Sequence, residues 1–362
     1  MNDQRQVEDK IRAYQKFWQR EEVSRPLIGF DIGGFFSLRR FPALCELEDG
    51  AVLSPELLAP ENYLAEYEAF YRRSAAIADD LIKGVAPIPA IPWIEAMLGC
   101  QVRISQASQS IWVEERNASW EELETLQLED DNPWLLTYLD FLAALERQAE
   151  GRYPVGQPFF RGITDLIGAL RGHNQALIDC LEQPQRIRRL AHQCADVLSD
   201  VTRKQYEVIQ PYQDGYFVEQ FSLWSPDITV RLQEDASAIY SPRLYRDLIQ
   251  DADRALAGAF PYSLIHLHSS SLFLLDDFLA ITDMDAFEVN KDVGGLSVEE
   301  MLPFFQTIQA HDRCLVIRGE LTREDIAVMQ NQLSPNGLLL QIVVDQVSAI
   351  DQYQGIREIA WG

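Results

Sequence analysis

The feature that most constrains the fold is a regular alternation of strand and helix patterns from about residue 150 to the end of the chain. Short apolar or β-branched runs are each followed by a segment with helical periodicity. The strand runs are 153–157, 215–221, 229–234, 262–268, 286–289, 314–317 and 338–344. The helical patterns span 164–171, 174–180, 184–210, 242–258, 271–281, 297–309, 322–332 and 349–358. Strand then helix, repeated, indicates parallel strands joined by crossover helices.

The length of 362 residues suits one closed barrel better than an open sheet. A (β/α)₈ barrel takes about 250 residues, which leaves room for an additional N-terminal part. We therefore predict an α/β fold, a (β/α)₈ TIM barrel with an N-terminal helical elaboration, as a single domain over residues 1–362. Residues 1–150 would form the elaboration and the first part of the barrel, with helices at 5–20 and 61–82 and a short helix from Trp93. Residues 151–362 would form the regular units.

Charge and composition exclude several classes of partner. The chain has 56 acidic against 31 basic residues, a formal charge of −25, which opposes binding to nucleic acid or anionic lipid. The N-terminus is charged and amphipathic, and no stretch approaches the 18 or so apolar residues of a membrane helix. We expect a cytoplasmic protein. The five cysteines are scattered without a CxxC pair, so neither a disulfide framework nor a cysteine-rich zinc site is indicated.

Two of the five histidines, His266 and His268, stand two residues apart at the end of a predicted strand. Residues at i and i+2 of a strand point to the same face, so both imidazoles can converge on one ion or one substrate. The alternative is a pair of neutral imidazoles that are hydrogen-bonded within a polar barrel mouth.

Other polar residues follow the predicted strands, where the active sites of such barrels lie. They are Arg161, Gln220, Glu234, Asp235, Asn290, Lys291, Asp292, Arg318, Glu320 and Asp345. Glu234 and Asp235 could act as an acid/base pair, or could simply face solvent before the next helix. Arg318 and Glu320 are two apart and could pair with each other, bind a carboxylate through the arginine, or ligate a metal through the glutamate.

From residue 158 onward the chain resembles the uroporphyrinogen decarboxylase superfamily. The similar stretches are PFFRGITDLIGALRG, QPQRIRRL, LQEDASAIYSPRLYRDL, SLIHLHSSS, MDAFEVNKDVG, LVIRGEL and NGLLLQIVV, in the same order and spacing. This superfamily includes the decarboxylases, corrinoid-linked methyltransferases and cobalamin-independent methionine synthases. The resemblance again implies a TIM barrel.

The methyltransferase branch of that superfamily carries His-x-Cys at one strand end and a second cysteine on the last strand. These residues bind zinc, which holds the acceptor as a thiolate. Here His266 matches the histidine, His268 stands in place of the cysteine, and the last-strand position falls on Val343 or Val344. A third ligand for zinc or another divalent metal would have to be a nearby carboxylate, namely Glu320, Asp292 or Asp345. The methyl donor that the resemblance implies is a corrinoid or a corrinoid protein.

Three hypotheses follow for a protein that acts on a small molecule. The first is methyl transfer at a metal site formed by His266 and His268. The second is decarboxylation of a porphyrinogen or another carboxylated substrate, with Glu234 or Asp235 as proton relay and Arg318 or Lys291 as carboxylate anchor. The third is a binding protein on a barrel without catalysis. A homodimer is the commonest assembly for such a chain.

Overall fold

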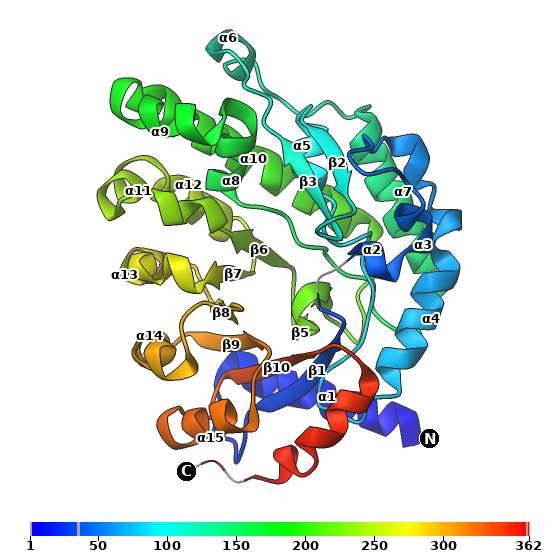
Figure 1. Ribbon diagram of the computed structural model, residues 1–362. Coiled ribbons are helices and arrows are strands. Elements are labelled where there is room, and N and C mark those ends of the chain that lie inside the picture. The colour runs from blue at the N-terminus through cyan, green and yellow to red at the C-terminus, as the bar shows by residue number, and fades with distance from the viewer. Residues whose placement is uncertain (1, 35–36, 360, 362) are drawn as a thin grey trace.

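A sheet of six parallel strands forms the centre of the computed structural model, which describes residues 2–34, 37–359 and 361. The strand order is β1-β10-β9-β8-β7-β6, and each neighbouring pair is parallel. The strands are β1 (Leu27–Ile32), β6 (Thr229–Gln233), β7 (Tyr262–His268), β8 (Ala286–Lys291), β9 (Cys314–Gly319) and β10 (Leu338–Val344). In Figure 1 they curve around a common interior with helices outside them. The fold is thus α/β with parallel strands, as predicted.

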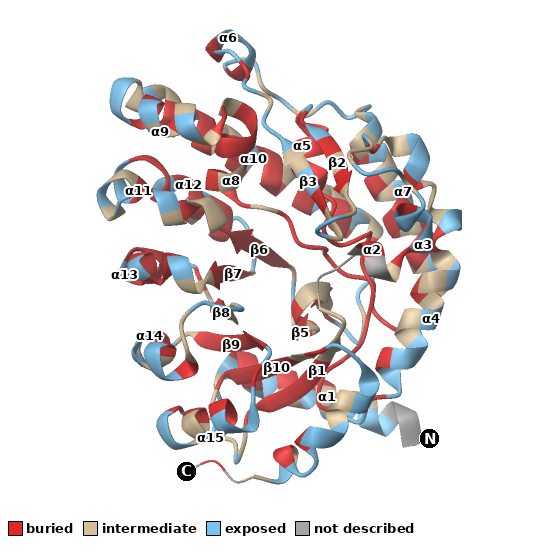
Figure 2. Ribbon diagram, viewed as in Figure 1, coloured by how far each residue is buried: buried red, intermediate tan, exposed pale blue. Residues whose placement is uncertain are grey.

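Crossover helices cover the outer face of this sheet. They are α11 (Pro242–Leu248), α12 (Gln250–Ala257), α13 (Leu275–Leu279), α14 (Val298–Ala310) and α15 (Arg323–Gln332). Alternate strand residues, such as Ile265 and Leu267 of β7, belong to the large apolar core that these helices share. Figure 2 shows the strands buried and the outward faces of the helices exposed. None of the described helices is long and apolar enough to cross a membrane.

The inner face of the sheet changes character along the strands. Near the strand starts it is apolar: Leu264, Ala286 and Leu339 join a second core cluster with Phe17 and Trp18 of α1 (Asn2–Gln19). Because α1 packs there, it closes the N-terminal end of the interior. Toward the strand ends the inner positions become polar, and this change places the candidate site at the C-terminal end.

The strand ladder does not close into a ring among the described residues. Single bridges, Val85 to Val155 and Gln157 to Val218, span the remaining gap in parallel orientation. Lys83 Nζ also donates to the Phe30 carbonyl, so a side chain satisfies part of the free edge of β1. The prediction of an eight-stranded barrel is therefore confirmed in part. The described residues form a ladder of six parallel strands, and isolated bridges extend it.

The N-terminal part and the middle of the chain supply the remaining elements. Helices there are α2 (Ser37–Arg40), α3 (Pro42–Cys45), α4 (Leu64–Ala75), α5 (Trp93–Met97), α6 (Trp120–Leu123), α7 (Pro133–Ala149), α8 (Ile163–Arg171), α9 (His173–Glu182) and α10 (Pro184–Val208). Two antiparallel pairs, β2 (Gln101–Ser105) with β3 (Ser110–Glu114) and β4 (Tyr216–Val218) with β5 (Leu223–Ser225), complete the strands. Short 3₁₀ turns, including Asp235–Ile239 after β6 and Ser269–Leu274 after β7, follow several strands.

Candidate metal centre

The candidate site lies where β6, β7 and β8 end. In the parallel register His266 of β7 is opposite Gln233 of β6 and Glu288 of β8, and His268 is opposite Asn290. In the strand alternation all of these residues occupy the same face as Leu264, which points inward. Their side chains therefore project into the interior rather than toward the helices. The prediction that the two histidines share one face is confirmed.

The two imidazoles are each held by a carboxylate at Nδ1 and meet through Nε2. His266 Nδ1 is hydrogen-bonded to Glu288, and His268 Nδ1 is 2.5 Å from Asp292 Oδ1. The Nε2 atoms lie 3.3 Å apart with the rings nearly perpendicular, at 83°. A carboxylate on Nδ1 fixes the proton there and leaves Nε2 as the atom that can ligate a metal.

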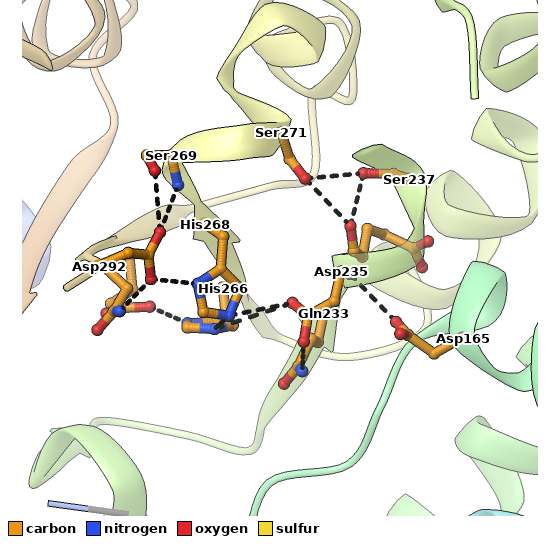
Figure 3. A network of polar contacts seen from close by, with 12 residues as sticks. Asp165, Gln233, Asp235, Ser237, His266, His268, Ser269, Ser271 and Asp292 are labelled. Atoms are coloured by element: carbon orange, nitrogen blue, oxygen red, sulfur yellow. Dashed lines mark hydrogen bonds and ion pairs between the residues drawn. The ribbon is translucent and has the colours of Figure 1, made fainter. Parts of the chain in front are cut away.

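Asp235 completes a group of three ligand atoms (Figure 3). Its Oδ1 lies 3.6 Å from His268 Nε2 and 4.0 Å from His266 Nε2, and it accepts no hydrogen bond from the described residues. The three ligand atoms lie within 4.8 Å of one another. A buried carboxylate oxygen without a donor is costly, so this oxygen suits a cation. Two histidines and one carboxylate form a legitimate donor set for zinc or another divalent metal.

A chain of buried polar residues holds Asp235 in place. Arg231 Nη2 donates to Gln233 Oε1 at 2.6 Å, and Gln233 Nε2 donates to Asp235 Oδ2 at 2.5 Å. The Asp235 amide donates to Asp165 Oδ2 at 3.1 Å. Burial lowers the pKa of Arg231 to about 10, which leaves its guanidinium charged at neutral pH. The orientation of Asp235 is thereby set by its neighbours.

Carboxylates dominate the electrostatics of the group. Burial alone would lower the pKa of His268, but the Asp292 hydrogen bond and the nearby charges of Asp235 and Glu288 raise it to about 9. Without an ion, His268 Nε2–H can therefore donate to His266 Nε2. A metal would displace that proton and offset the negative charge around it.

A cavity of about 270 Å³ opens directly onto these ligand atoms. Its lining residues are Ala90, Gln109, Ser110, Ile111, Phe159, Arg161, Gln220, Gln233, Asp235, His266, His268, Asn290 and Arg318. Sites for drug-sized ligands usually have about 300–1,000 Å³, so this cavity suits a small molecule.

The other residues singled out in the sequence occupy different places. Arg318 lines the cavity, but its Nη2 donates to Asp31 at 2.6 Å and its Nη1 to Asn290 at 3.4 Å. Lys291 Nζ lies 2.7 Å from Asp325 Oδ2 and is not among the cavity-lining residues. Glu320 is exposed at the end of β9 and lies outside the three-residue group, where Asp235 takes the third position.

Glu234 stabilises the N-terminus of α8. Its two carboxylate oxygens accept hydrogen bonds from the Ile163 and Thr164 amides and from the Thr164 hydroxyl. A carboxylate in this position satisfies the free amides of a helix N-terminus. Burial, with Asp253 nearby, raises the pKa of Glu234. The predicted pair is therefore split, with Asp235 at the cavity and Glu234 at the helix.

Sequence reasoning missed two residues of the site, Glu288 and Gln233. The signal was present, because Glu288 lies at an alternate position of the predicted strand 286–289 and Gln233 at an alternate position of 229–234. A charged or amide side chain inside a buried strand needs a partner, and here the partners are His266 and Asp235.

Comparisons with known proteins establish the fold. No model of a known protein family matches the sequence, and no curated protein matches it either. Among solved structures, a methyltransferase from Methanosarcina mazei is similar, with a TM-score of 0.64 over 92% of each chain at 11% sequence identity. At that identity the likeness shows that the two proteins share a fold.

Proposed function

We propose that this protein is an enzyme that transfers a methyl group to a thiol on a small molecule, assisted by a divalent metal. The metal, zinc as the first candidate, would be held by Asp235, His266 and His268. The observation that carries the proposal is the convergence of two Nε2 atoms and one unpartnered carboxylate oxygen on a cavity. The shared fold with a protein named as a methyltransferase supports it.

A bound divalent metal lowers the pKa of a coordinated thiol, so that the acceptor is present as a thiolate at neutral pH. Glu288 and Asp292 keep the histidine protons on Nδ1, while Gln233 holds Asp235. Asp235, His266 and His268 would supply three protein ligands to the metal, and the thiol of the acceptor would bind beside them. The methyl donor in this proposal is a methylated corrinoid, free or carried by a partner protein. The thiol would lose its proton to solvent, its sulfur would take the methyl group, and the corrinoid would leave with the electron pair of the broken carbon–cobalt bond.

Decarboxylation of a carboxylated substrate is the second candidate, and one observation favours it. Burial, with Asp235 nearby, raises the pKa of Asp165, and this carboxyl accepts a hydrogen bond from the amide of the cavity residue Asp235. Arg318 lines the same cavity. A barrel that binds a ligand without catalysis is the third candidate.

Metal analysis of protein purified without an affinity tag tests the first proposal. We expect about one equivalent of zinc in the wild type, loss of that zinc in His266→Ala and His268→Ala, and retention in His311→Ala, whose side chain is exposed. Methyl transfer from methylcobalamin to 3-mercaptopropionate should require the bound metal. Metal-free protein that consumes uroporphyrinogen would contradict the proposal and support decarboxylation.

A further inference from the structure

Arg161 lies on the cavity wall, and some of its N–H groups have no acceptor among the described residues. Arg161 lines the same cavity as Asp235, His266 and His268. Among the described residues its ion pair is with Glu95, where Nε lies 3.5 Å from Oε1. An arginine binds a carboxylate through a fork of two N–H groups, and this pairing through Nε leaves the terminal nitrogens for a ligand. Arg318, in contrast, already uses both terminal nitrogens.

Glu95 is positioned to orient the Arg161 side chain through their ion pair. It belongs to the short helix α5, is only 1% exposed, and neither of its carboxylate oxygens accepts a hydrogen bond from the described residues. A buried carboxylate in this state needs a cation, and Arg161 is its ion-pair partner.

The backbone beside Arg161 is fixed against the end of β6. The next residue, Gly162, packs so closely that a Cβ there would lie 1.3 Å from the Gln233 carbonyl oxygen. Gln233 also holds Asp235. The arginine and the metal-ligand group are therefore attached to the same strand end, and their separation cannot change much without disturbing β6.

From these contacts we infer that Arg161 anchors an anionic group, of the carboxylate kind, on the small molecule that reacts at the Asp235–His266–His268 group. Glu95 is a positioning residue for that arginine. The inference rests on the proposed function and assigns Arg161 as the residue that distinguishes an acidic thiol from a neutral one. Since Arg161 and the Asp235–His266–His268 group line one cavity of about 270 Å³, a small thiol acid is a suitable probe of both.

Isothermal titration calorimetry with a matched pair of thiols tests the inference. 3-Mercaptopropionate and 3-mercapto-1-propanol have the same chain length and differ in the carboxylate. In wild-type protein we expect the acid to bind at least about tenfold more tightly than the alcohol, because a hydrogen-bonded pair of opposite charges stabilises the complex by about that much. Arg161→Gln should remove that preference without changing the affinity for the alcohol. Arg161→Lys should keep part of it.

Two further variants distinguish a role of Glu95 in positioning Arg161 from a general loss of structure. Glu95→Gln should weaken binding of the acid and leave binding of the alcohol unchanged. Arg243→Gln alters an arginine whose side chain is 86% exposed on α11, and should leave both affinities unchanged. Equal affinities for the two thiols in the wild type, or a preference that survives Arg161→Gln, would overturn the inference.

The titrations are run on cobalt-loaded protein and on metal-free protein, so that the two proposals can fail separately. If the protein binds no metal, the proposed function fails, and the carboxylate preference of the metal-free protein still decides the role of Arg161. If metal and thiols bind and the carboxylate makes no difference, only the role of Arg161 is contradicted.

Discussion

Glu288→Gln gives the sharpest prediction about the metal centre. Glu288 is fully buried and holds His266 Nδ1, and glutamine keeps its size while it removes the negative charge. Loss of such a partner behind a metal ligand typically weakens metal binding about 10- to 100-fold. This corresponds to about 1.4 to 2.8 kcal/mol of zinc-binding free energy, at 1.4 kcal/mol per tenfold change. The number of zinc ions bound should stay at one.

Competition with a chromophoric chelator measures the zinc affinity, and thermal unfolding checks it independently. At a zinc concentration of about 100 times the wild-type Kd, bound metal should stabilise the wild type by about 2.7 kcal/mol. At the same concentration the variant should gain only about 0.4 to 1.4 kcal/mol. Glu320→Gln, at an exposed position outside the group, is the control and should behave as the wild type. Wild-type zinc affinity in Glu288→Gln, or an equal loss in Glu320→Gln, would refute the reasoning.

Three other changes probe the supports of the site and the fold. Gly162→Ala should lower the free energy of unfolding in urea by about 3 kcal/mol or more, because its Cβ would meet the Gln233 carbonyl; wild-type stability would contradict the close packing. Gln233→Leu removes the donor to Asp235 Oδ2, so zinc affinity should fall about tenfold in chelator competition. Burial alone would raise the pKa of Asp80, but hydrogen bonds from Arg25 and the Ile28 amide lower it. Its stabilisation is therefore full above an unfolded pKa of about 3.9 and is lost as pH falls through the folded pKa. Asp80→Asn should lower stability at pH 7 and reduce this acid dependence in urea titrations.

The regular C-terminal half of the fold could be predicted because each strand is a bounded apolar run. Strands β7 and β10 have the predicted limits of 262–268 and 338–344. Strand β1 was missed, since Leu27–Ile32 precedes the region of regular alternation. The predicted strand 153–157 makes only isolated bridges, and Pro154 within it has no amide to donate to a ladder. The predicted helix 349–358 forms 3₁₀ turns at Val347–Tyr353 and Ile356–Glu358.

The histidine pair of the site could be predicted because strand parity fixes the face of each side chain. The third residue of the candidate group depends on the path of the chain after a strand, which parity does not give. Asp235 continues the inward series of Arg231 and Gln233 beyond the end of β6. Glu320 follows Gly319, which has a φ of +144°, and the chain turns away there so that the glutamate is exposed.

X-ray absorption spectroscopy of the zinc-loaded protein tests the central claim most directly. We predict a first shell of nitrogen and oxygen at about 2.0–2.2 Å, with imidazole scattering and no sulfur, because no cysteine is part of the group. Addition of 3-mercaptopropionate should introduce one zinc–sulfur distance of about 2.3 Å. A zinc ion that persists in Asp235→Ala, His266→Ala and His268→Ala, or a spectrum to which the thiol adds no sulfur, would contradict the account.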